Sequence, residues 1–419
     1  MNDEKIQEKA KSLTENEELC DHCLGRQFAQ LGHGLENYER SSIIQNTDLG
    51  ELSEESFDPE NVPEDADEGG QCSICQGVFG ELGKYTDMVI DSFDRYELNT
   101  FLIGIRPPEP VEREEEDLWE EYGIEFTEPI KTEISRLIGK RIESRLDIIV
   151  DFERADIMAV IDMREGKERV ELQVNSILFY AQYNKYSREI PQTEWHCRNC
   201  RGSGCDECDW TGKQYPTSVQ EEIQDPFIRE SNAIEAKFHG NGREDVDAKC
   251  LGKREFVLEL IEPLNRELDV ESLQEEVNES SDKIEIFELE ETYKDKVEEI
   301  KETRTKKEYR AKVRTSENIT EEDLEKLEGA ETVIEQRTPE RVEHRRADKV
   351  RDREVHEIDY QLIDEKTFYL YVKAEAGTYI KELIHGDDGR TQPNIADILG
   401  CEAECLELDI TWVEKVGNQ

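Results

Sequence analysis

A short charged loop carries the side chains of this chain that are best suited to nucleophilic chemistry. The sequence GREDVDA at 242–248 lies between two extended-looking runs at 233–239 and 256–260. A carboxylate at a strand end is held where a substrate can reach it, and a cation two residues away, Arg243, would keep it ionised near neutral pH. The loop therefore offers Asp245 as a nucleophile. A salt-bridged hairpin loop would have the same composition, because acidic loops are common in a chain this charged.

Eight of the 11 cysteines stand in Cys-x-x-Cys pairs, a spacing typical of metal thiolates in a reducing compartment. The first two pairs predict one closed, structural zinc site, with free thiols or an iron–sulfur cluster as alternatives: Cys20, Cys23, Cys72 and Cys75. The last two pairs predict a second metal site, with reduced thiols as the alternative: Cys197, Cys200, Cys205 and Cys208. His22 is expected to lie beside the first metal or to face solvent rather than to bind the ion.

The charge balance is strongly acidic. The 419 residues include 53 Lys and Arg against 103 Asp and Glu, a formal net charge of -50. Carboxylates spread over a whole chain are typical of proteins that stay hydrated in concentrated salt. At molar salt the Debye length falls to about 3 Å, so this charge does not exclude an RNA substrate. The length is enough for two or three domains.

Targeting signals are not evident in the sequence. No apolar run approaches the length that spans a bilayer, and the first residues lack the basic and apolar regions of a signal peptide. We therefore expect a cytoplasmic protein. Neither a membrane contact nor an obligatory protein partner is indicated.

The region from 83 to 190 predicts an α+β unit. Strands are expected at 101–105 and 147–152, with an amphipathic helix at 130–146 between them. Further strands are expected at 157–162 and 170–174. The helix carries Lys and Arg on its polar face, which is either an RNA-contacting patch or a solvated surface.

The C-terminal half predicts strands at 284–289, 305–313 and 368–375, with helices at 268–277 and 316–328. The most basic segment, 340–353, is either an RNA-backbone contact or an internally paired hairpin arm.

The strand at 368–375 leads into a helix at 378–385 that Thr378 is expected to open. Its first turn would place Tyr379 and Lys381 together at one end of the sheet.

Three motifs of this half together resemble the pseudouridine synthases. Gly-Arg-x-Asp at 242–245 is similar to the family's aspartate loop, KEY at 307–309 to its tyrosine strand, and GTYIK at 377–381 to the motif with a basic partner. The runs GREDVD at 242–247 and GTYIKE-x-x-HGD at 377–387, with both cysteine clusters, resemble the archaeal and eukaryotic tRNA pseudouridine-54/55 synthases. This resemblance covers nearly the whole chain.

The resemblance implies an α+β protein with a catalytic domain on a mixed or antiparallel sheet, plus a zinc-binding and THUMP-like accessory domain. It implies a tRNA substrate modified in the T-loop at positions 54 and 55, structural zinc, and no organic cofactor. The expected divisions are a zinc-binding segment at 1–82, a THUMP-like RNA-binding domain at 83–190, a second cysteine cluster at 191–216 and the catalytic domain at 217–419.

The resemblance also implies roles for five residues. Asp245 would be the nucleophile and Lys381 its cationic partner, where many synthases have Arg. Tyr309 would stack on the flipped base, Tyr379 would be a further substrate contact, and Arg243 would support the loop. Asp247 is the competing nucleophile, although the Arg-x-Asp spacing favours Asp245 and leaves Asp247 to brace the loop.

Two other functions fit parts of the sequence. One is a THUMP-type tRNA-binding protein with other modification chemistry, and the other is a zinc-dependent protein-binding adaptor. The chain has neither a Gly-rich dinucleotide loop after a strand nor a phosphate-cradling Gly-Lys-Ser/Thr loop, which weighs against methyl-transfer and thiolation chemistry.

Overall fold

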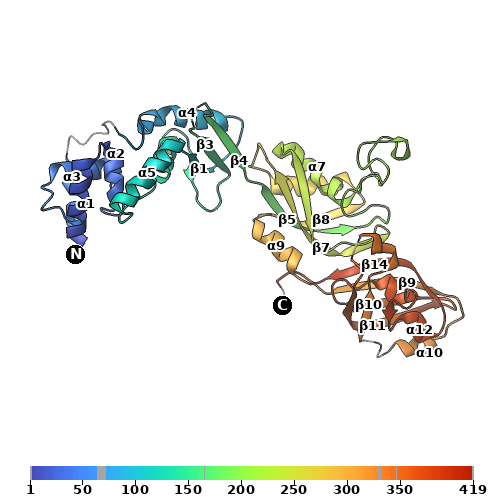
Figure 1. The fold of residues 1–419 in the computed structure, drawn as a ribbon. Coiled ribbons are helices and arrows are strands. Elements are labelled where there is room, and N and C mark those ends of the chain that lie inside the picture. The colour runs from blue at the N-terminus through green and yellow to red at the C-terminus, as the bar shows by residue number, and fades with distance from the viewer. Residues whose placement is uncertain are drawn as a thin grey trace. The chain divides into compact units, whose positions relative to one another are not determined.

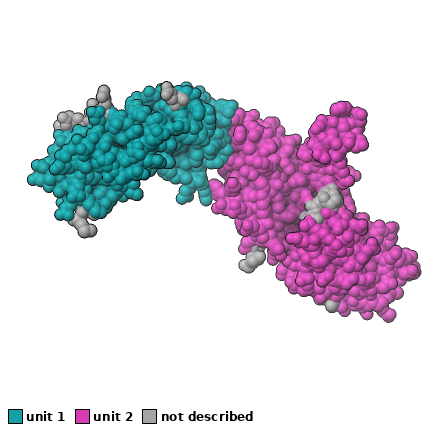
Figure 2. Space-filling view, in the orientation of Figure 1, with its two compact units in different colours: residues 1–175 teal, residues 176–419 magenta. Residues whose placement is uncertain are grey.

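The computed structural model describes residues 2–63, 72–164, 166–328, 330, 332–345 and 347–417. The chain divides into two compact units, 1–175 and 176–419 (Figure 2). Within the described ranges no helix is both long enough and apolar enough to cross a membrane.

The first unit begins with a group of helices around the first cysteine pairs and continues into a four-stranded sheet (Figure 1). The sheet has the order β2-β1-β3-β4, and the helix that covers β1 buries Ile130, Ile134, Ile138 and Ile142, each 1% exposed or less. The helices are α1 (Asn2–Asn16), α2 (Asp21–Gly25), α3 (Asn37–Asn46), α4 (Leu82–Phe93), α5 (Glu109–Tyr122) and α6 (Ile130–Glu143). The strands are β1 (Thr100–Arg106), β2 (Ile149–Val150), β3 (Ile157–Asp162) and β4 (Arg169–Val174).

The second unit is built on one ten-stranded sheet with the order β13-β10-β11-β12-β9-β14-β7-β5-β8, and β6 also pairs with β7. The β14–β7 pair is parallel and the others are antiparallel, which confirms the mixed sheet of the expected α+β fold. The strands are β5 (Ile177–Lys185), β6 (Glu235–Gly240), β7 (Ala248–Ile261), β8 (Ile284–Thr292), β9 (Lys307–Thr315), β10 (Val333–Arg337), β11 (Val350–Asp364), β12 (Thr367–Ala374), β13 (Thr391–Gln392) and β14 (Ala403–Val413).

Two large apolar cores and one smaller apolar cluster lie on this sheet. One large core joins β9, β12 and β14 to the helices near the C-terminus, and the other joins β5, β7 and β8 to α7 and α8. Strand β7 contributes its first residues to one core and its last residues to the other, so the loop before β7 lies where both halves meet. The helices are α7 (Val219–Ser231), α8 (Val270–Ser280), α9 (Lys294–Glu302), α10 (Glu321–Leu324), α11 (Ile380–His385) and α12 (Ile395–Leu399).

Three details differ from the sequence-based expectation. Residues 177–185, grouped by sequence with the accessory domain, form β5 and pair with β7 and β8 inside the second unit. The helix expected at 316–328 is only α10 followed by a 3-10 turn at Glu325–Leu327. Helix α11 begins at Ile380 because the Thr378 hydroxyl donates to the Glu375 carbonyl, 2.8 Å away, instead of capping the helix.

Candidate active site and cysteine clusters

Buried side chains fix the backbone of the acidic loop between β6 and β7. The Lys185 ammonium donates to the carbonyls of Asp245 and Val246 at 3.1 and 2.9 Å. The Gln192 amide donates to the Gly242 carbonyl at 2.9 Å. Lys185 is fully buried, and burial lowers its pKa. A buried donor left without these carbonyls would be costly, so the loop has one favoured path.

The buried side chain of Glu244 also anchors this loop. Its carboxylate accepts a hydrogen bond from the Tyr183 hydroxyl at 2.9 Å and pairs with the Arg254 guanidinium at 3.1 Å. Arg254 also donates to the Asn241 carbonyl at 2.8 Å. The Glu244 side chain is buried, whereas that of its neighbour Asp245 is 33% exposed. Anchoring Glu244 inward therefore turns Asp245 outward.

Asp245 faces a cavity of about 790 Å³. The cavity is lined by side chains from separate parts of the second unit, including Tyr309 from β9 and Tyr379 and Lys381 from the start of α11. Asp245 and three other predicted site residues thus lie around one space. Arg243 also borders this cavity, but its side chain is exposed.

Two cations flank the Asp245 carboxylate. The Arg341 guanidinium lies 3.0 Å from one oxygen and the Lys381 ammonium 3.5 Å from the other. Arg341 is itself held by Glu382, a buried carboxylate 2.6 Å away. Burial opposes the charge of Arg341, but Glu382 and Asp245 outweigh it and raise the pKa of the guanidinium. The arrangement compensates the negative charge of Asp245 from both sides.

The other aspartate of the loop makes a closer pair with Lys381. Both Asp247 oxygens accept from the Lys381 ammonium at 2.8 Å. Burial would raise the pKa of Asp247, but the hydrogen bonds and charge of Lys381, with the charge of Arg341, lower it overall. Asp247 is therefore the closer ionic partner of Lys381.

Arg341 was not among the residues predicted for the site. Within the described part of the chain, the ionic partners of Asp245 are Arg341 and Lys381, and not Arg243. Arg341 belongs to the basic segment 340–353, which was expected to contact RNA or to pair internally. It lies 96 residues from Asp245 in sequence, so only tertiary structure brings the two together.

Tyr309 lies on the cavity wall and is 8% exposed. Burial raises the pKa of its hydroxyl to about 12, although the nearby charge of Arg254 opposes the shift. The ring is therefore a neutral aromatic surface near neutral pH. Lys307 stands two residues earlier on the same strand face, and burial, followed by the charge of Arg254, lowers its pKa to about 7.

We expect Arg341→Gln to lower kcat/KM for the reaction at this site by about 10- to 100-fold. The substitution removes a charge-assisted hydrogen bond to Asp245 and leaves the buried Glu382 carboxylate without its partner. Steady-state kinetics would measure the loss. The matched control is Arg337→Gln, since exposed Arg337 pairs with Asp348 and does not line the cavity. Equal kinetics for the two variants would contradict a role for Arg341 at this site.

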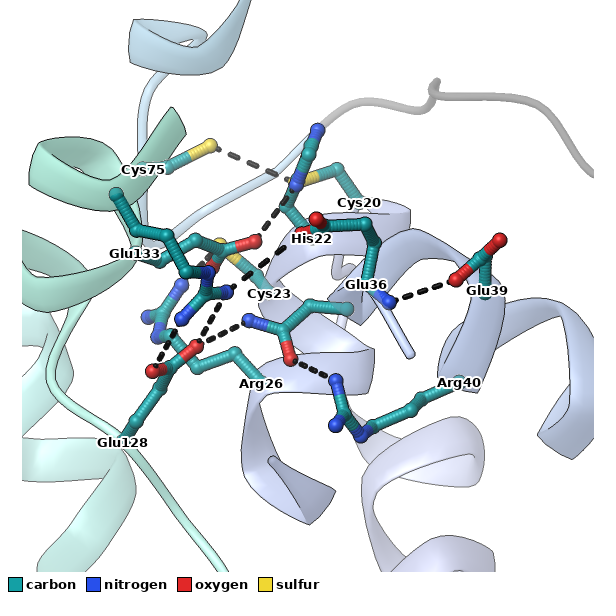
Figure 3. A network of polar contacts seen from close by, with 12 residues as sticks. Cys20, His22, Cys23, Arg26, Glu36, Glu39, Arg40, Cys75, Glu128 and Glu133 are labelled. Atoms are coloured by element: carbon teal, nitrogen blue, oxygen red, sulfur yellow. Dashed lines mark hydrogen bonds and ion pairs between the residues drawn. The ribbon is translucent and has the colours of Figure 1, made fainter. Parts of the chain in front are cut away.

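The first four cysteines converge on one point. The sulfurs of Cys20, Cys23, Cys72 and Cys75 all lie within 4.8 Å of one another. Figure 3 shows the contact between Cys20 and Cys75, whose sulfurs are 3.6 Å apart. Four sulfurs at about 2.3 Å from a tetrahedral zinc ion lie about 3.8 Å apart, so the group fits that ion. Buried Arg26 donates to the Cys23 sulfur at 3.0 Å. Burial raises the pKa of the Cys23 thiol, and the charge of Arg26 opposes that rise.

His22 lies next to this cluster and not in it. Its Nδ1 is 2.8 Å from the buried carboxylate of Glu133 (Figure 3). Its ring stacks on Phe79, with the ring centroids 4.2 Å apart. The group that could hold a metal contains the four cysteines without His22. This agrees with the expectation that His22 supports the site from its side.

The second four cysteines also converge. Sulfur–sulfur distances of 3.8 to 3.9 Å again fit one tetrahedral ion. Backbone amides donate to two of the sulfurs, from Gly204 to Cys200 at 3.1 Å and from Gly212 to Cys208 at 3.2 Å. Burial opposes ionisation, but backbone hydrogen bonds lower the pKa of Cys208 to about 6.

Comparison with known proteins covers both units. Residues 179–414 match the family model described as "Pus10, C-terminal", and residues 85–162 match "Pus10 THUMP domain, archaeal". Three similar proteins, each called "tRNA pseudouridine synthase Pus10", come from Methanothermobacter marburgensis, Halorubrum lacusprofundi and Methanopyrus kandleri. They are 40%, 39% and 40% identical to this chain over 97%, 94% and 96% of its length and 98%, 93% and 97% of their own.

Proposed function

This chain belongs to the Pus10 family of tRNA pseudouridine synthases, and on that premise we propose that Asp245 is the nucleophile with which it isomerises uridine in tRNA. The observation that carries the proposal is the exposed Asp245 carboxylate in a cavity between two cations. Neither a binding module nor a zinc adaptor would require a carboxylate held in this way.

The reaction exchanges one bond of the nucleoside for another. The Asp245 carboxylate attacks the uridine at the ribose or at the base, and the glycosidic bond between ribose C1′ and base N1 breaks. The detached uracil rotates and forms a bond from its C5 to C1′. The hydrogen on C5 then leaves as a proton, and N1 takes up a proton, so no redox partner is needed. The carboxylate is released unchanged.

The other cavity residues act on the base and on Asp245. The target uridine must leave its stack to reach the cavity. Tyr309 offers a neutral ring on which the uracil stacks, and Tyr379 stands on the wall beside it. Lys381 and Arg341 pair with the carboxylate and orient it. A contact with Asp245 or a position around the same cavity supports each of these proposed roles.

The two cysteine clusters have a structural role in this proposal. A zinc ion held by Cys20, Cys23, Cys72 and Cys75 would tie the N-terminal helices of the first unit together. The second unit would carry its own ion in the segment between β5 and α7. The isomerisation itself needs no organic cofactor.

We propose the T-loop uridines at positions 54 and 55 as the targets. Unmodified tRNA is expected to gain pseudouridine at both positions, and transcripts with cytidine at one of them should gain it only at the other. Carbodiimide adducts that stop reverse transcription would locate each product. A transcript with cytidine at both positions is the control, and pseudouridine formed in it would contradict the assignment of the target while leaving the reaction intact.

A further inference from the structure

The second cysteine cluster forms a small lobe with an unusual backbone. Residues 195–215 project from the second unit, drawn in green beside α7 in Figure 1 and visible as a separate lobe in Figure 2. After Cys75 and after Cys200, the last cysteines of two Cys-x-x-Cys pairs, the next two residues both have positive φ. Glycine occupies the second of these two positions in both cases, as Gly77 (φ 84°) and Gly202 (φ 98°). After Cys208 the same place is taken by Trp210, with φ of 62°.

A tryptophan gains nothing for the fold at this position. The left-handed region is unfavourable for a bulky L-residue, whereas glycine adopts it freely. Trp210 is 72% exposed, and among the residues that the structure describes its indole makes no ring contact or hydrogen bond. A strained backbone at an exposed side chain that does not pack against the fold indicates a role in binding rather than in folding.

The surroundings of Trp210 suit a nucleic acid. Arg198 and Arg201 lie on the same lobe, are exposed, and form no ion pair within the described ranges. Their guanidinium groups are therefore available for phosphate. The lobe has three cations and three carboxylates, Arg198, Arg201 and Lys213 against Asp206, Glu207 and Asp209. Apart from its thiolates it is therefore neutral in a chain of net charge -50.

The lobe is connected to the active-site cavity. Its stem is a short antiparallel bridge between His196 and Lys213, and the Gln214 amide donates to the Trp195 carbonyl at 2.8 Å. Trp195, at the base of this stem, lines the cavity that contains Asp245. A substrate held at Asp245 therefore passes close to the foot of the lobe.

We infer that Trp210 is a stacking platform for an unpaired base of the tRNA near the target uridine, with Arg198 and Arg201 contacting the adjoining phosphates. This inference rests on the proposed function for the identity of the RNA. Stacking suits this protein because it depends little on salt, whereas phosphate attraction is screened at high ionic strength.

The decisive variant is Trp210→Gly, because glycine stands at the matching place, Gly77 and Gly202, in the two other pairs with this backbone turn. We expect it to keep its metal content and its melting temperature, or to raise the latter, while Kd for tRNA and KM rise by about tenfold. Trp210→Phe should recover most of the affinity. Ile234→Ala, at another exposed apolar residue (66%) of the same unit, is the matched control and should bind as the wild type does.

Salt dependence separates stacking from charge. Replacing both arginines, Arg198→Gln with Arg201→Gln, should make the negative slope of log K against log salt shallower by about 1.4, since each single-strand phosphate contact contributes about 0.7. Trp210→Gly should leave that slope unchanged. A slope change in the glycine variant without a loss of affinity at high salt would overturn stacking.

A second readout does not depend on the glycine variant. The fluorescence of Trp210, obtained as the difference between the wild type and Trp210→Phe, should be quenched when tRNA is added. Absence of quenching would overturn the stacking inference. Unchanged Kd and KM in Trp210→Gly, with a wild type that still forms pseudouridine, would also overturn this inference but not the proposed function. A wild type that binds tRNA and forms no pseudouridine would instead overturn the proposed function.

Discussion

Asp245→Asn should abolish pseudouridine formation, with a fall in the single-turnover rate on the order of 10³-fold or more. The amide has the shape of the carboxylate but cannot act as the nucleophile. The loop should keep its position, because Lys185 holds the backbone carbonyls of Asp245 and Val246 and not the carboxylate. Nucleoside chromatography of tRNA after incubation at saturating enzyme would measure the rate.

Asp247→Asn is the matched comparison, since it makes the same chemical change two residues away. It removes the brace on Lys381 and should therefore slow the reaction far less than Asp245→Asn does. Equal melting temperatures and tRNA affinities would show that both variants are folded. An inactive Asp247→Asn beside an active Asp245→Asn would exchange the roles of the two aspartates.

Removal of metal from the N-terminal cluster should have the largest effect on stability. Without an ion, the four converging sulfurs and buried Arg26 remain together in the core of the first unit, and no metal holds the sulfurs in place. A structural zinc ion stabilises a small domain by several kcal/mol. If about 5 kcal/mol is lost, the melting temperature of a unit of this size falls by about 10–20 °C. Calorimetry before and after chelation would detect it.

Single cysteine variants assign the metal to each cluster. Cys72→Ser should reduce the zinc content by one equivalent and destabilise the first unit, while Cys205→Ser should reduce it by one equivalent in the second unit. Cys401→Ser is the control, because Cys401 lies outside both groups. Unchanged zinc content in the first two variants would contradict both sites.

The nucleophile loop could be predicted because its features are local. A charged turn between two strands is visible in any window that contains Asp245, and the structure confirms β6 and β7 on either side of it. Tyr309 and Lys381 could be placed through family motifs that are equally local, although only the fold shows that they border one cavity. Helix α6 was visible for the same reason, since its isoleucines recur at every fourth position.

The sequence could not predict the contact of Arg341 with Asp245 or the strand β5, and the physical reasons differ. Arg341 joins Asp245 through a contact between distant segments, and the basic segment around it gives no indication of which carboxylate it will meet. In β5 all nine residues are buried, so the strand has no alternation of apolar and polar side chains to mark it.

The most direct test of the central claim uses tRNA labelled with tritium at uridine C5, incubated in high salt with the wild type and with Asp245→Asn. Bond formation at C5 must release that hydrogen, so the wild type should release one tritium for each pseudouridine formed. The variant should release none above background. Equal release by both proteins, or none by either, would contradict isomerisation by Asp245.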